Sequence, residues 1–222
     1  FDVLADVSAL ETFPEEFELL RVQMGEKLDD GGRRPLWAGT ALASLGLEND
    51  AKVQEDLTKL NNLIPTEFPD NVVAEAEASA AAPFEDADKL TDLRGELLVT
   101  IDGEDARDFD DAISMTRDDE GRRVLGVHIA DVSHFVRPGS QLDEEARERG
   151  TSVYLVDRVI PMLPEQLSNG VCSLRPDEDR LCLSAFLTFD DAGKMVGRRF
   201  AKTIIRSKLR LDYEQALAII EG

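Results

Sequence analysis

Residues 98–115 read LVTIDGEDARDFDDAISM and have the most distinctive pattern in the chain. Its centre, residues 102–111, holds five aspartates and one glutamate against a single basic residue, Arg107. The apolar runs on either side, 97–101 and 112–115, have the composition of buried strands. The sequence therefore brings a cluster of carboxylates against a hydrophobic core, where mutual repulsion and burial both disfavour their charged forms. A bound cation is the usual compensation, and all-oxygen ligands favour Mg²⁺ or Mn²⁺.

The chain has 222 residues, of which 42% are hydrophobic, enough to bury a substantial core in one large domain or two small ones. Its formal net charge of −21 by itself argues against a nucleic-acid partner, because phosphate binding uses Lys and Arg. The charge is unevenly distributed, however. Residues 194–210 contain seven basic residues and no acid, so this segment is expected to form either an RNA-facing surface or a plain solvated sheet face.

The cysteines and the hydropathy pattern indicate a cytoplasmic protein. Cys172 and Cys182 are the two cysteines, and they form no CxxC motif, so both are expected to be reduced thiols in the core. No apolar run reaches the roughly eighteen residues of a membrane span, and no signal peptide is visible. Because the first residue is Phe1, the true N-terminus is expected to lie upstream.

Residues 1–61 are expected to form a small N-terminal module, with a turn at 29–32. Two interpretations of this module stay open. One is an OB-like β-barrel. The other makes residues 38–62 a helix-turn-helix, with Gly46 in the turn and 51–60 as the second helix. Arg and Lys are scarce where a recognition helix needs them, which favours the barrel.

Residues 62–91 are expected to be a helical connector between this module and the remainder of the chain. The prolines within 64–69 exclude a helix interior there. Asp70 or Asn71 is then expected to cap a helix that runs through residue 77. The small and acidic stretch 79–88 is expected to be exposed.

From residue 92 to residue 222 the pattern is that of a mixed α+β domain. Strands are predicted over residues 98–101, 109–115, 123–132, 154–160, 180–189 and 196–211. Helices are predicted over 143–149, with Gly150 as the stop, and over 213–220, with Asp212 as the cap. The last helix ends in the middle of an apparent α/β run, so the sequence is expected to continue beyond Gly222.

Three blocks in this second part resemble a known family. They are TIDGEDARDFDDAIS (100–114), HIADVSHFVRPGSQLDEEARERGTSVYL (128–155) and VIPMLPEQLSNGVCSLRPDEDRLCLSA (159–185). In that order they resemble the RNB-type catalytic domain of the ribonuclease II and ribonuclease R family. The resemblance is continuous from about residue 92 to residue 222. Residues 45–78 also resemble the segment that leads into that domain in the ribonuclease R branch.

The resemblance implies a processive 3′→5′ exoribonuclease that uses a divalent metal, Mg²⁺ or Mn²⁺, and releases 5′-nucleoside monophosphates from single-stranded RNA. It implies a mixed sheet-and-helix domain with a deep RNA channel, in a monomer without a DNA substrate. The alternative that stays open is an RNA-binding protein with an inactive nuclease domain. Such members lose aspartates from the acidic cluster.

The family's four catalytic aspartates correspond to Asp102, Asp108, Asp110 and Asp111. All four are expected at the metal site, with Asp102 and Asp111 as direct ligands and Asp110 as the most critical for chemistry. Asp108 is expected to support the metal or the attacking water. Neighbouring residues on a strand point to opposite faces, so Asp108 and Asp110 are expected to share one face. Glu104 and Asp105 do not match catalytic positions and are expected to face solvent.

Two further residues are expected to contact RNA. Tyr154 matches a family tyrosine that packs against the base near the 3′ end, and an aromatic face suits binding without sequence preference. A core tyrosine on a strand is the alternative. Arg180 is expected to have a structural or a phosphate-facing role. The family's downstream arginine and glutamate have no counterpart in these residues, so the chain alone is expected to be incomplete as an enzyme.

Overall fold

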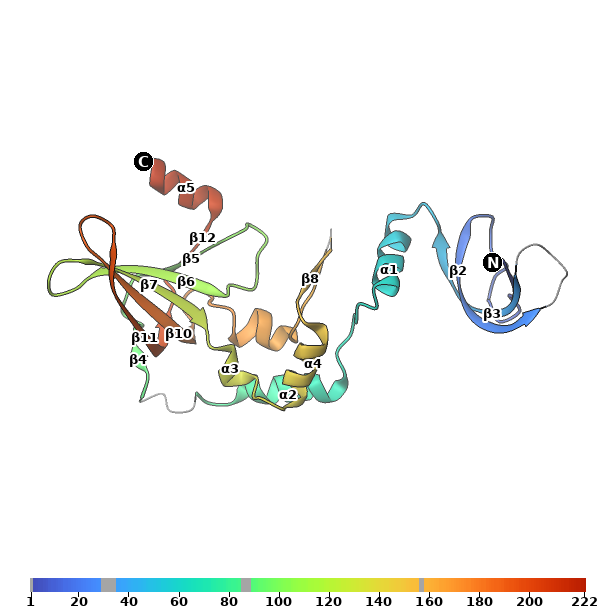
Figure 1. The fold of residues 1–222 in the computed structure, drawn as a ribbon, viewed down its shortest axis with the longest axis horizontal. Helices are drawn as coiled ribbons and strands as arrows, with labels where there is room; N and C mark the ends of the chain where they lie inside the picture. Colours follow the sequence, from blue (N-terminus) through green and yellow to red (C-terminus); the bar gives the residue numbers. More distant parts are fainter. Residues whose placement is uncertain (1, 29–34, 85–88, 156–157) are drawn as a thin grey trace. The chain divides into compact units, whose positions relative to one another are not determined.

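The computed structural model describes residues 2–28, 35–84, 89–155 and 158–222 (Figure 1). The chain forms two compact units, Phe1–Thr66 and Glu67–Gly222. The turn expected at 29–32 lies outside the described residues.

The first unit is built on a three-stranded sheet in the order β1-β3-β2. β1 (Asp2–Asp6) pairs parallel to β3 (Leu36–Leu47), and β2 (Glu18–Leu28) pairs antiparallel to it. The helix α1 (Ala51–Asn61) follows, and the Asp50 side chain caps it by accepting a hydrogen bond from the Lys52 N–H at 2.8 Å. The N-terminal module is therefore a β-sheet followed by a helix.

The helix-turn-helix interpretation of residues 38–62 is wrong, because residues 38–47 continue β3. This strand is paired on both edges, which satisfies its backbone N–H and C=O groups. Its burial also alternates in the middle, where Ala41 is fully buried between exposed neighbours, as expected for a strand with one covered face. Gly46 lies inside the strand at a φ of +102° that favours glycine, beside an irregularity in the pairing with β2.

The second unit is built on a seven-stranded mixed sheet in the order β12-β5-β6-β7-β10-β11-β4. These strands are β4 (Thr91–Asp92), β5 (Leu98–Asp102), β6 (Asp111–Arg117), β7 (Arg123–Ala130), β10 (Asp179–Phe189), β11 (Met195–Arg206) and β12 (Leu209–Asp212). The inner neighbours are antiparallel, whereas the two edge strands β4 and β12 are parallel to their partners. A separate short pair consists of β8 (Val153–Tyr154) and β9 (Val159–Ile160). The expected α+β class is confirmed.

Helices cover one face of this sheet (Figure 1). They are α2 (Asp70–Ala81), α3 (Val132–Phe135), α4 (Gln141–Arg149) and the helical turn Gln166–Val171. Side chains such as Val72, Leu142 and Leu167 share a buried cluster with Leu181 and Ile205 of the sheet. Burial of this apolar surface is the main stabilising contribution to the unit.

The helix α2 departs from its prediction at both ends. It begins at Asp70, so Pro69 occupies the cap position and makes no side-chain cap hydrogen bond. It also continues to Ala81, inside the stretch expected to be an exposed connector. The reason is tertiary: Ala76 is fully buried, and the Ser79 hydroxyl donates to the Phe135 carbonyl at 2.9 Å.

The strand predicted over 196–211 is broken in two. β11 ends at Arg206, and β12 begins at Leu209 and pairs with β5 on the far side of the sheet. The Lys208 N–H donates to the Leu98 carbonyl at 2.9 Å and starts this new pairing. The helix α5 (Tyr213–Glu221) follows with a capping box between Asp212 and Gln215, so the predicted Asp212 cap is confirmed.

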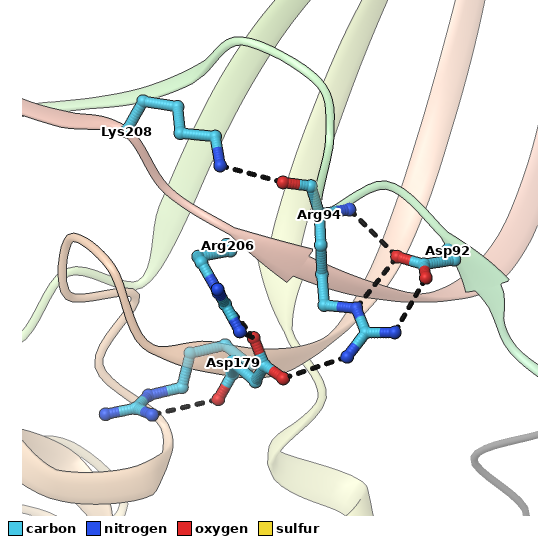
Figure 2. Close-up of polar contacts among 6 residues, drawn as sticks. Asp92, Arg94, Asp179, Arg206 and Lys208 are labelled. Atoms are coloured by element: carbon cyan, nitrogen blue, oxygen red, sulfur yellow. Dashed lines mark hydrogen bonds and ion pairs between the residues drawn. The ribbon is translucent and has the colours of Figure 1, made fainter.

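A cluster of charged side chains links the β4 edge of the sheet to the neighbouring strands (Figure 2). Arg94 bonds the Asp92 carboxylate at 2.7 Å and Asp179 at 3.1 Å, and Arg206 bonds Asp179 at 2.7 Å. Lys208 donates from Nζ to the Arg94 carbonyl at 2.8 Å. The hydrogen bonds from Arg94 lower the pKa of Asp92 to about 2. The cluster joins the segment before β5 to the strands β10 and β11.

A series of hydrogen-bonded polar side chains, centred on the buried His128, crosses the middle of the sheet. Its Nδ1 lies 2.7 Å from the Ser184 hydroxyl, and its Nε2 lies 3.0 Å from the Ser114 hydroxyl. Gly126 leaves the space for this contact, because a Cβ there would lie 2.3 Å from Ser114 Oγ and 2.6 Å from His128 Nε2. Burial of the imidazole lowers the pKa of His128 to about 4.

Stability is therefore expected to fall as pH decreases through the window between the two pKa values of His128. Its ordinary pKa is 6.5 and its folded pKa is about 4, so within this window only the unfolded chain takes up the proton. Urea unfolding at about pH 7 and about pH 5 should differ by about 2 kcal/mol from this group. His128→Gln should flatten this dependence of stability on pH. An unaltered profile in His128→Gln would contradict the assignment.

Cys172 and Cys182 are both buried free thiols. Burial raises the pKa of Cys172 to about 12, so its thiol stays protonated at neutral pH. None of the helices in the described ranges has the length and apolar character needed to cross a membrane.

Candidate active site

The acidic stretch forms a loop of residues 103–110 between two strands, and we call it the acidic loop. Asp102 is the last residue of β5, and Asp111 is the first residue of β6. Asp108 and Asp110 lie in the loop itself, so the expectation that a strand begins at 109 and sets their common face is corrected. At Phe109 the backbone does not pair with a neighbouring strand, because its carbonyl accepts a hydrogen bond from Leu174 N at 2.8 Å.

The acidic loop lines a cleft of about 960 Å³ in the second unit. The sequence-predicted residues that line this cleft are Asp102, Asp108, Asp110, Asp111 and Tyr154. Glu104 and Asp105 line it as well, with exposed side chains. Other walls come from Arg158, Glu165 and Asn169. The structure therefore brings all four expected aspartates and the expected tyrosine to one cavity.

The carboxylates of this cleft influence one another's ionisation. Burial, followed by the charges of Asp111 and Asp108, raises the pKa of Asp102. Burial, followed by the charge of Asp108, also raises the pKa of Asp110, although its side chain keeps an exposed edge in the cleft. Opposing these effects, the charge of Arg210 on β12 lowers the pKa of Asp102. The cleft is thus a concentrated negative site in which Arg210 partly offsets the effect on Asp102.

The donor set suits a hard divalent cation in its chemistry. Carboxylate oxygens are the ligands that Mg²⁺ and Mn²⁺ prefer, and the buried Asp102 Oδ2 has no hydrogen-bond partner among the described residues. The carboxylates stand farther apart than the ligands of a bound metal ion, since no three His, Cys, Asp or Glu side chains in the described ranges converge to hold a metal. Like charges in a shared cleft repel, which disfavours their closer approach.

The sequence did not predict the side chains that hold the acidic loop in place through hydrogen bonds to its backbone. The Ser173 hydroxyl accepts from Phe109 N at 3.1 Å and donates to the Arg107 carbonyl at 2.8 Å. Arg210 donates to the carbonyls of Gly103, at 2.9 Å, and Glu104. The resemblance of 159–185 to the family was the available signal for Ser173. No local signal pointed to Arg210.

The two residues expected to contact RNA differ in their surroundings. Tyr154 is 69% exposed at the cleft, so the core-tyrosine alternative is wrong. The negative charge of Asp108 is the main influence that raises the pKa of Tyr154. Arg180 is only 7% exposed and donates to the carbonyls of Ser173, at 2.7 Å, and Asp179, at 2.9 Å. Of its two expected roles, these contacts favour the structural one.

Comparisons with known proteins agree with this architecture. The matching family model is described as the RNB domain and covers residues 90–222. Ribonuclease R of Thermotoga maritima is 51% identical over 158 residues, which are 71% of this chain and 22% of that protein.

Solved structures extend the match to nearly the whole chain. RNase R of Mycoplasma genitalium in complex with double-stranded RNA has a TM-score of 0.83 and 29% identity, covering 99% of this chain and 38% of that chain. Yeast Ssd1, described as a pseudonuclease, has a TM-score of 0.72 and 18% identity, covering 93% of this chain and 26% of that chain.

The chain spans roughly a quarter of the length of the curated relatives it matches, 22% for one and 26% for the next. The family model nevertheless covers more than half of the chain, including the acidic loop and every strand of the seven-stranded sheet. On this evidence, the chain belongs to the RNB domain family.

Proposed function

We propose that the protein is a hydrolytic 3′→5′ exoribonuclease that releases 5′-nucleoside monophosphates from single-stranded RNA. The observation that carries the proposal is the meeting of Asp102, Asp108, Asp110 and Asp111 in one cleft beside an exposed tyrosine. Relatives named ribonuclease R support it. The fold alone does not, because Ssd1 shares it and is described as a pseudonuclease.

In this proposal the four aspartates have two different roles. Asp102 and Asp111, at the ends of two adjacent strands, would hold a divalent cation from opposite ends of the acidic loop. The cation, when bound, activates water and neutralises charge on the scissile phosphate. Asp108 and Asp110 lie between these two ligands in the loop, where their carboxylates would support the metal and orient the attacking water.

Tyr154 would hold the base at the 3′ end of the RNA. Its side chain is exposed at the cleft and close enough to Asp108 for that charge to raise its pKa. A base stacked on the ring would therefore place its own phosphate near the carboxylates. Stacking uses the π-face that every base has, so it suits degradation without sequence preference.

Tyr154→Ala is expected to lengthen the shortest RNA product while cleavage continues. Loss of base stacking costs about 1–3 kcal/mol per base, so short products, which depend most on this contact, dissociate before the last cuts. The measurement is the end-product length of 5′-labelled RNA on a sequencing gel. Tyr154→Phe keeps the ring and should retain the wild-type product. The same end product in Tyr154→Ala would exclude the stacking role.

The proposed function is tested by incubating the intact protein with single-stranded RNA and Mg²⁺. With RNA labelled at its 3′ end, the first product should be a labelled 5′-nucleoside monophosphate. With RNA labelled at its 5′ end, a ladder should shorten from the opposite end. The second candidate, an RNA-binding protein with an inactive nuclease domain, is suggested by the match to Ssd1. It predicts RNA binding with no monophosphate release under any divalent cation.

A further inference from the structure

A buried serine holds the C-terminal half of the acidic loop. Ser173 is fully buried, and its hydroxyl bonds the backbone of Phe109 and of Arg107, the two residues on either side of Asp108. The next residue, Leu174, adds a backbone hydrogen bond to the Phe109 carbonyl. Phe109 itself is buried in the core cluster. These contacts fix the direction in which the chain passes through Asp108.

The N-terminal half of the loop is held from a different part of the sequence. Arg210 lies on β12, in register with Thr100 of β5, and donates to the carbonyls of Gly103 and Glu104. Its guanidinium carbon lies 5.3 Å from the centre of the Phe109 ring. One side chain therefore contacts both halves of the loop. Both hydrogen bonds leave from Nη2, and the planar guanidinium makes them while it lies over the Phe109 ring, an arrangement that suits a guanidinium better than an ammonium group.

We infer that Ser173 and Arg210 are positioning residues that together fix the acidic loop in the shape that places the carboxylates of Asp108 and Asp110 in the cleft. This positioning role rests on the proposed function, because only in a nuclease do the carboxylates of the loop take part in catalysis. Arg180 supports one of the two anchors, because it donates to the Ser173 carbonyl at 2.7 Å from a buried position.

The charge of the loop explains why it needs anchors. Residues 102–111 carry six acidic side chains and one basic one, and their mutual repulsion favours open conformations. Few contacts within the loop oppose this; one is the hydrogen bond from Ala106 N to the Gly103 carbonyl at 3.1 Å. The anchors bond backbone groups, so they hold the path of the chain and leave the carboxylates free to meet a substrate or cation.

Hydrogen exchange of the backbone amides of residues 104–109 in the intact protein tests the inference without any activity measurement. Ser173→Ala and Arg210→Met are each expected to speed exchange in this segment about tenfold, the effect of losing one or two hydrogen bonds. Two matched controls should leave it unchanged. Ser184→Ala removes an equally buried hydroxyl that bonds His128, and Arg206→Met removes a nearby arginine that pairs with Asp179.

A second readout separates positioning from simple destabilisation. In single-turnover hydrolysis of RNA, both variants should lower the cleavage rate at least about tenfold with little change in the Kd for RNA. Arg210→Lys should recover only part of the loss, because it restores the charge and not the planar group over the Phe109 ring.

The outcomes distinguish this inference from the proposed function. Wild-type exchange at 104–109 in Arg210→Met, which removes only a half-buried side chain, would overturn the positioning role. Full rescue by Arg210→Lys would also overturn it, in favour of a charge effect. An intact protein that fails to hydrolyse RNA but shows the tenfold exchange differences would refute the proposed function and leave the anchors in place.

Discussion

Asp110→Asn is expected to lower the rate of RNA hydrolysis by the intact protein at least about a hundredfold, with RNA binding retained. The substitution keeps the size of the side chain and removes one negative charge from the cleft. Burial and the charges of its acidic neighbours raise the pKa of Asp110, so its carboxylate lies where negative charge is concentrated. An amide in that place cannot serve as a metal ligand or base of the same strength.

Binding should survive because the change reduces repulsion of the RNA phosphates. The measurement combines single-turnover cleavage of 5′-labelled RNA with a filter-binding Kd. Asp105→Asn is the matched control, since Asp105 lies in the same loop, lines the same cleft and is not one of the four aspartates proposed to act in hydrolysis. It should cleave at close to the wild-type rate. Equal losses in the two variants, or loss of binding in Asp110→Asn, would refute the special role of Asp110.

Leu174→Ala is expected to reduce the free energy of unfolding of the second unit by about 3 kcal/mol, within the range of 2–5 for buried leucines. Leu174 is fully buried in the core cluster, so truncation leaves a cavity between the sheet and its helices. Its backbone also bonds the Phe109 carbonyl, so loosening at this point reaches the acidic loop.

Urea unfolding followed by far-ultraviolet circular dichroism measures this effect. Leu183→Ala is the control, because Leu183 belongs to β10 of the same sheet but is 51% exposed. Its truncation should change stability by less than about 0.5 kcal/mol. A loss of under about 1 kcal/mol in Leu174→Ala would mean that the core relaxes around this position.

Local sequence determined the elements whose signals lie within a few residues. The run 98–115 predicts a strand, an acidic turn and a second strand, and the structure has β5, the acidic loop and β6 in that order. The cap at Asp212 and the stop at Gly150 are also local, since each depends on one side chain or one backbone conformation. Family resemblance predicted four aspartates at the metal site, and the structure has all four in the lining of one cleft.

Other features depended on partners far away in the chain. Residues 38–47 form a strand because β1 and β2 pair with both of its edges, and a local pattern of small apolar residues does not record those partners. Arg180 carries a charge that predicts exposure, yet carbonyls of other segments enclose it. These hydrogen-bond partners are backbone carbonyls, which every residue type has, so the sequence gives no sign of them.

The acidic loop shows the same division. Its composition was sufficient to predict a site of concentrated negative charge, because six carboxylates within ten residues repel one another in any conformation. Composition could not predict what holds the loop in place. Ser173 reaches it from 64 positions away and Arg210 from 107, through the packing of Phe109 and the pairing of β12 with β5. Those contacts exist only after the sheet has formed, so the tertiary structure alone decided how the carboxylates are presented.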